Sequence, residues 1–199
     1  MTGRRRLAVA VAAAALGVAA PLRADTMSLV STVCVACHGD GGNSVVPMFP
    51  RLAGLQVEYL DKQLKDFRSG KRKSDIMAPA LANLKDDDIP GLAAYYAAQK
   101  PQPGTVSDAK LAAAGKLLFD DGNTASGVPA CVGCHQPAGA GNERYPRLAS
   151  QHPTYTTQQM ILFKTGARTN DKARVMRAVA ERLTEREIAA LSEYLVSLP

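Results

Sequence analysis

The chain has 199 residues, of which 46% are apolar and 5% are aromatic, and it contains no tryptophan. Its formal charge is +6, from 24 basic and 18 acidic residues. This length suits one medium domain or two small ones. The absence of a Lys/Arg run with interleaved aromatic residues argues against a nucleic-acid-binding protein.

The first 24 residues have the pattern of a secretory signal peptide. Three arginines at 4–6 precede a run of small apolar residues, 7–20, that is too short to span a membrane as a helix. Cleavage after Leu22–Ala24 would remove four of the 24 basic residues, which leaves 20 basic against 18 acidic ones. We expect export to the periplasm, free or loosely attached to the inner membrane; a retained membrane anchor is the alternative.

All four cysteines fall in two Cys-x-x-Cys pairs, and a histidine directly follows each pair. The motifs are Cys34-Val35-Ala36-Cys37-His38 and Cys131-Val132-Gly133-Cys134-His135. Two thiols can add to the two vinyl groups of a haem, and the adjacent imidazole can reach the iron. We therefore predict two covalently bound haem c groups, with His38 and His135 as axial ligands. Zinc sites or disulfides are the alternatives, but neither explains the repeated histidine.

Four further segments are predicted to be helical. Residues 59–67 place Leu60, Leu64 and Phe67 on one stripe, and residues 89–99 follow three aspartates that favour a helix N-terminus. Residues 109–119 have a helical composition, and residues 184–187 form a capping box that opens a last helix. No useful alternating strand pattern occurs, which predicts an all-α fold with long loops.

The two halves of the chain form an internal repeat. The second motif follows the first at an offset of 97 residues, and Phe49–Ala53 recurs as Tyr145–Ala149 at an offset of 96. Tyr59, Gln63, Phe67 and Gly70 recur at the same offset of 96 as Tyr155, Gln159, Phe163 and Gly166. A Pro/Gly-rich linker, 101–106, is predicted to separate an N-terminal domain, 25–100, from a C-terminal domain, 107–199.

The repeat also selects a second axial ligand for each iron. Methionine is the usual choice in electron-transfer haems, because its soft thioether favours reduced iron. Met77 and Met176 occupy equivalent positions in the repeat, whereas Met27, Met48 and Met160 have no equivalent methionine. We predict Met77 and Met176 as axial ligands; packing in the core, the usual role of an isolated methionine, is the alternative.

With these motifs, the chain resembles the dihaem cytochrome c4 family, in which two class I cytochrome c domains are fused. The resemblance covers nearly the whole chain after the signal segment, including both Pro-Arg-Leu-Ala segments and Ile76–Pro79. The segment Val175–Ala178 lacks the proline of Ile76–Pro79 and departs from the pattern. The resemblance implies an all-α fold of two tandem cytochrome c-type domains, each wrapping one haem.

The resemblance also implies roles for residues that follow each motif. In class I cytochromes c, a proline carbonyl accepts a hydrogen bond from the haem histidine, so Pro50 and Pro146 are expected to orient the two ligands. Ordinary loop prolines are the alternative. Arg51 and Arg147 stand beside them, and each is expected either to pair with a haem carboxylate or to be solvated.

We predict an electron-transfer protein rather than an enzyme. Two six-coordinate irons leave no place for a small-molecule substrate, which argues against a peroxidase. Single electrons would pass from a donor of the quinol–cytochrome c reductase type to a terminal oxidase or another reductase. The alternative is a cytochrome subunit of a complex such as a flavocytochrome sulfide dehydrogenase, with a flavoprotein partner. His152, outside both motifs, aligns with Gln56 and is expected to make a hydrogen bond or lie at the surface.

Overall fold

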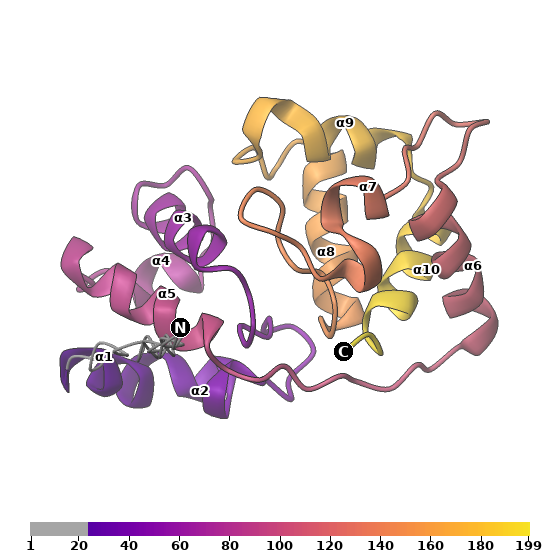
Figure 1. Cartoon of the computed structure of the whole chain (residues 1–199). Helices are drawn as coiled ribbons and strands as arrows, with labels where there is room; N and C mark the ends of the chain where they lie inside the picture. The colour runs from indigo at the N-terminus through magenta and orange to yellow at the C-terminus, as the bar shows by residue number, and fades with distance from the viewer. Residues whose placement is uncertain (1–23) are drawn as a thin grey trace, which may run out of the picture.

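A computed structural model describes residues 24–199 as two helical lobes joined by an extended segment (Figure 1). The predicted signal peptide lies outside the described residues, apart from Ala24. No β-ladder forms in the described part of the chain, where only Asn123 and Val128 make an isolated bridge. The predicted all-α fold is therefore confirmed. None of the described helices is long and apolar enough to cross a bilayer.

The N-terminal lobe is built around the first motif. Its helices are α1 (Ala24–Leu29), α2 (Val35–His38), α3 (Val57–Arg68), α4 (Met77–Ala80) and α5 (Ile89–Ala97). A π-helical turn, Val30–Cys34, joins α1 to α2, so the first motif lies at the end of one continuous helical stretch. The helices predicted at 59–67 and 89–99 are confirmed, with α3 slightly longer and α5 slightly shorter than expected.

The C-terminal lobe repeats this plan. Its helices are α6 (Ala109–Asp121), α7 (Val132–His135), α8 (Pro153–Lys164), α9 (Val175–Arg182) and α10 (Glu185–Leu195). The predicted capping box is present, because the Thr184 hydroxyl accepts from the Glu187 amide at 3.2 Å and the Glu187 carboxylate accepts from the Thr184 amide at 2.8 Å. Helices α6 and α10 pack side by side, and they meet at Gly115 (Figure 1).

Each lobe has its own apolar core, and each core reaches one motif. In the N-terminal lobe, α3 and α5 enclose residues such as Leu60, Ile89 and Leu92, with Cys34 packed at the edge. The core of the C-terminal lobe contains Phe119, Ile188, Leu191 and Leu195 among others, with Cys131 at its edge. The cores thus anchor the two Cys-x-x-Cys-His motifs independently.

The segment between α5 and α6, which contains the predicted linker, is fixed to both lobes. The Gln102 amide donates to the Asn43 side chain at 2.9 Å, and the Gly104 amide donates to the Val196 carbonyl at 2.8 Å. The Arg51 guanidinium adds a hydrogen bond to the Gln102 carbonyl at 2.8 Å. These contacts fix the extended segment, which runs from one lobe to the other in Figure 1, to the surface of both lobes.

Candidate functional site

A cavity of about 1530 Å³ lies between the lobes and brings the predicted ligands of both together. Its lining includes Cys34, Cys37, His38 and Met77 from the N-terminal lobe, and His135 and Met176 from the C-terminal lobe. Cys131 and Cys134 are not part of this lining, although they share α7 and its N-cap with His135. Most of the exposed lining is apolar, as a large flat cofactor with an apolar body requires.

His38 is buried at the end of α2, and its orientation is fixed by one hydrogen bond. Its Nδ1 donates to the Pro50 carbonyl at 2.8 Å, as expected, which leaves Nε2 as the free ring nitrogen. Burial lowers the pKa of His38 and outweighs the opposing effect of the Pro50 carbonyl, so the neutral imidazole is favoured. A neutral imidazole with a fixed tautomer is the form that binds iron.

His135 has the same environment in the second lobe. Its Nδ1 donates to the Pro146 carbonyl at 2.8 Å, and burial again lowers its pKa. The backbone after the two histidines differs in residue type but not in shape. Gly39 has φ 73° and ψ 173°, and Gln136 has φ 66° and ψ 163°, a region that is nearly restricted to glycine.

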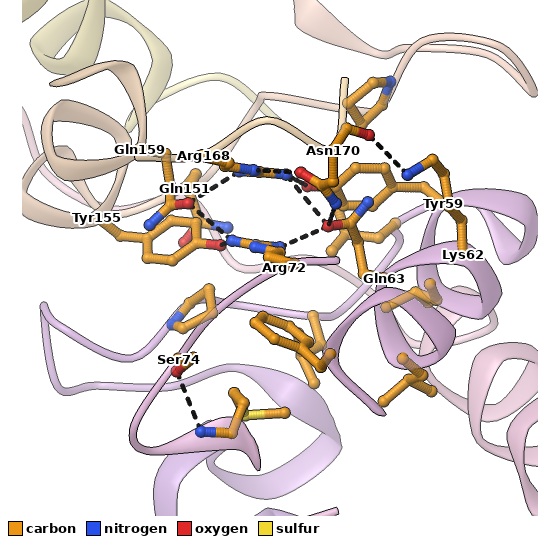
Figure 2. A pocket seen from close by; sticks show the side chains of 18 of the residues that line it. Tyr59, Lys62, Gln63, Arg72, Ser74, Gln151, Tyr155, Gln159, Arg168 and Asn170 are labelled. Carbon is orange, nitrogen blue, oxygen red and sulfur yellow. Dashed lines mark hydrogen bonds between the residues drawn. The ribbon is translucent and has the colours of Figure 1, made fainter. Parts of the chain in front are cut away.

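The two predicted methionine ligands are half-buried at the cavity wall. Met77 is the first residue of α4, and its amide donates to the Ser74 hydroxyl at 3.1 Å (Figure 2). Met176 lies in the first turn of α9, after two consecutive left-handed residues, Ala173 and Arg174. These strained residues fall where the second repeat carries its three-residue insertion.

The other methionines differ from this pair. Met48 also lines the cavity, but its side chain is 56% exposed. Met160 packs against the core of the C-terminal lobe, and neither it nor Met27 lines the cavity. Among the methionines of residues 24–199, Met48 alone therefore shares the cavity with the two at equivalent repeat positions.

The residues that are present fit a covalently bound haem better than the alternatives. All four cysteines are free thiols, and residues 24–199 contain no group of three His, Cys, Asp or Glu side chains that could hold a metal ion. Burial raises the pKa of the Cys131 thiol to about 11. Two buried polar atoms on the cavity lining, the Tyr96 hydroxyl and Arg147 Nε, have no hydrogen-bond partner among the described residues. A cofactor that carries carboxylates can satisfy such donors.

The two arginines beside the prolines differ in their contacts. Arg51 does not line the cavity, and its guanidinium donates to the backbone carbonyls of Ser44, Gln102 and Ser150 at 3.3, 2.8 and 2.7 Å. The half-buried Arg51 side chain thus joins the two lobes and the linker. Arg147 does line the cavity, and one of its terminal nitrogens donates to the Pro199 carbonyl.

Several contacts between the lobes cannot be predicted from the sequence of either repeat alone. Gln151 accepts from the Arg51 amide at 2.9 Å, and Gln56 accepts from the Arg147 amide at 2.7 Å. His152 is buried, and its Nε2 donates to the Ser44 carbonyl of the other lobe at 2.8 Å. Of the two roles expected for His152, a hydrogen bond or a place at the surface, the structure therefore shows the hydrogen bond.

A second set of contacts between the lobes involves residues that the sequence analysis left without a role. Arg72 and Arg168 sit at an offset of 96, the same offset that relates the repeated tyrosines and glutamines of α3 and α8. Their side chains meet at the centre of the cavity (Figure 2). The repeat carries a partial signal, because Arg72 and Arg168 follow α3 and α8 at the offset that relates the two repeats.

Comparison with known proteins gives consistent matches over both lobes. The cytochrome c family model matches residues 27–99 and 112–199. Cytochrome c4 of Thiocapsa roseopersicina is 47% identical over 83% of this chain and 87% of its own length. The crystal structure of reduced recombinant cytochrome c4 from Pseudomonas stutzeri superposes with a TM-score of 0.84 at 41% identity, over 91% of this chain and all of that one.

One further relative is named for the enzyme that supplies its electrons. A thiosulfate dehydrogenase electron acceptor of Thiomonas intermedia is 36% identical over 98% of this chain and 92% of its own length.

Proposed function

Because the chain belongs to the cytochrome c4 family of dihaem electron-transfer proteins, we propose that it carries single electrons between redox partners in the periplasm. The observation that carries this proposal is the cavity between the lobes, whose lining combines a buried histidine and a methionine from each repeat. Bound haem supplies an iron that takes up and releases one electron at a time. The chain is not itself an enzyme.

In this proposal, His38 and Met77 hold one iron, and His135 and Met176 hold the other. Each histidine presents Nε2, because its Nδ1 hydrogen is engaged by a proline carbonyl at 2.8 Å. This hydrogen bond also makes the imidazole a stronger ligand. With both axial positions filled by the chain, neither iron is open to a small-molecule substrate.

Arg147 is proposed to bind a haem carboxylate. Its Nε is buried on the cavity lining without a hydrogen-bond partner among residues 24–199. A charge-assisted hydrogen bond to a carboxylate would satisfy that donor. We do not propose this role for Arg51, whose guanidinium is engaged by three backbone carbonyls.

The ligand assignment is tested by spectroscopy of the purified holoprotein and of single variants. The protein should contain two haems per chain, and its oxidised form should show the thioether-to-iron charge-transfer band. Met77→Ala and Met176→Ala should each remove about half of that band and allow azide to bind one iron. Met48→Ala is the matched control, because Met48 lines the same cavity, and it should leave the band unchanged. An undiminished band in either ligand variant contradicts the assignment.

Two routes for the electrons fit this proposal. As a free carrier, the protein would accept electrons from a quinol–cytochrome c reductase type of donor and pass them to a terminal oxidase. The likeness to a thiosulfate dehydrogenase electron acceptor favours a second route, in which a periplasmic dehydrogenase reduces the protein. Affinity purification from the native cell distinguishes them: a stoichiometric dehydrogenase partner supports the second route, and a lone haem protein supports the first.

A further inference from the structure

The centre of the interface between the lobes contains two buried arginines that the proposed function does not use. Arg72 follows α3 and Arg168 follows α8, at equivalent positions of the repeat, and each is only 7% exposed. We call them the guanidinium pair. Figure 2 shows the two groups facing each other, with polar side chains of both lobes around them.

Arg72 is held mainly by the opposite lobe. Its Nη2 donates to the Tyr155 hydroxyl and to the Gln159 side-chain oxygen, both at 2.7 Å, and its Nη1 donates to Gln63 at 2.7 Å. Its guanidinium also lies over the Phe67 ring, 4.5 Å from the centroid. Arg72 is therefore fixed in position by both lobes.

Arg168 makes the reciprocal set of contacts. Its Nη2 donates to the Tyr59 hydroxyl at 3.2 Å and to Gln63 at 3.1 Å, and its Nη1 donates to Gln159 at 2.8 Å. Its guanidinium lies over the Phe163 ring, 4.4 Å from the centroid. Because both arginines donate to the same two glutamine oxygens, the two positive charges lie close together.

The guanidinium pair has no carboxylate partner in the described part of the chain. Neither arginine forms an ion pair there, and the side-chain acceptors of the pair are glutamine, asparagine and tyrosine oxygens. Burial opposes the ionisation of Tyr59, but Arg168 and Arg72 outweigh burial and lower the pKa of that hydroxyl to about 8. The carboxylate in this network, Asp66, accepts from Asn170 at 2.7 Å and pairs with Lys62 instead. Burying like charges without a counter-charge is costly, and neutral side chains of similar volume would join two lobes at lower cost.

Arg72 remains charged in this environment. Burial lowers the pKa of Arg72, but the Tyr155 and Tyr59 hydroxyls outweigh it and raise that pKa above its usual value. A guanidinium is in any case protonated at all physiological pH values. The interface thus contains two fixed positive charges, each on a residue that is only 7% exposed.

Both arginines line the same cavity as the proposed haem ligands of both lobes. A positive charge in a poorly solvated cavity stabilises the iron with the extra electron, because that state carries one less positive charge. We propose that the guanidinium pair is a shared electrostatic element that raises the reduction potential of both haems. This inference rests on the proposed haem binding. Haem carboxylates in the cavity would reduce the size of the effect without changing its sign.

The test is a spectroelectrochemical titration of haem-loaded variants. Arg72→Gln and Arg168→Gln should each lower both potentials, including that of the haem in the other lobe. At a fixed electrode potential, the ratio of reduced to oxidised haem should fall about tenfold, which is about 59 mV for one electron. Asp66→Asn removes a negative charge from the same network and should raise both potentials.

Two further variants separate charge from other effects. Arg72→Lys retains the charge but loses the planar set of donors, and it should leave both potentials within about twofold of the wild-type ratio. Arg68→Gln is the matched control, because Arg68 ends the same helix but is paired with Asp86 at the surface; it should change the ratio by less than about twofold.

The proposal is overturned if the Gln variants change both potentials no more than Arg68→Gln does. It is also overturned if Arg72→Lys lowers the potentials as much as Arg72→Gln does, because geometry rather than charge would then be responsible. If a Gln variant does not fold, Asp66→Asn decides: raised potentials support the proposal, and unchanged ones overturn it. Purified protein without haem contradicts the proposed function, whereas haem-loaded variants with unmoved potentials contradict this inference alone.

Discussion

Replacing Gly115 by alanine tests the packing of the C-terminal lobe. Gly115 lies in α6 where this helix crosses α10, and an added Cβ would sit 2.0 Å from the Ala190 carbonyl oxygen. An ordinary contact needs at least 3.4 Å, so the helices must separate by about 1.4 Å. Such overpacking against backbone costs about 3 kcal/mol, and the better helix propensity of alanine returns about 1 kcal/mol. We expect a net loss of about 2 kcal/mol.

Thermal unfolding of the holoprotein, followed by far-UV circular dichroism, measures this loss. For a domain of this size, about 2 kcal/mol lowers the unfolding midpoint of the lobe by roughly 10 °C. Gly133→Ala is the matched control, because nothing lies within 4 Å of a Cβ at that position, and the equivalent residue of the first motif is Ala36. It should leave the midpoint unchanged or raise it by at most about 5 °C, because Gly133 also lies in a helix, where alanine has the better propensity. A Gly115→Ala midpoint within about 3 °C of the wild type would refute the close approach of α6 and α10.

Two more substitutions test the backbone and the pH response. Gln136→Gly should stabilise the protein by about 1 kcal/mol, because glycine adopts φ 66° and ψ 163° without the strain of a side chain. The reverse change at the equivalent position, Gly39→Gln, should destabilise the protein. Urea unfolding measures both changes, and a less stable Gln136→Gly variant would show that this backbone is not strained. Burial and the nearby Arg51 lower the pKa of His152, and the opposing effect of the Ser44 carbonyl is smaller. The neutral form of His152 is therefore favoured by folding. Its contribution to stability is complete above the ordinary pKa of about 6.5 and is lost as the pH falls below that value. His152→Gln should therefore make the free energy of unfolding less dependent on pH between about 5 and 7; an equally steep dependence would show that His152 is not responsible.

Local signals predicted four of the ten described α-helices, namely α3, α5, α6 and α10. The capping box at Thr184 and the apolar stripe from Leu60 to Phe67 act within a few residues, so one stretch of sequence is enough to read them. The carbonyls of Pro50 and Pro146 each accept a hydrogen bond from the histidine of the preceding motif, as the resemblance to class I cytochromes c implies. Each of these features is contained within one repeat.

The contacts between the lobes could not be predicted in the same way. Arg51 reaches Ser150, and Arg72 reaches Tyr155, across separations that no periodicity within one repeat encodes. Arg72 and Arg168 share the offset of 96 that relates the repeats, but a shared offset does not say that equivalent residues face each other. The unusual backbone at Gln136 was also missed, because glutamine has no preference for that conformation.

The reciprocal contacts of the guanidinium pair have the form of an isologous interface. Arg72 binds Tyr155, and its counterpart Arg168 binds the counterpart of that tyrosine, Tyr59, as in a two-fold symmetric homodimer. Here both halves belong to one polypeptide, so the second half is present at a high effective concentration. Dilution that would dissociate a homodimer therefore leaves these two lobes, and any electron exchange between them, intact.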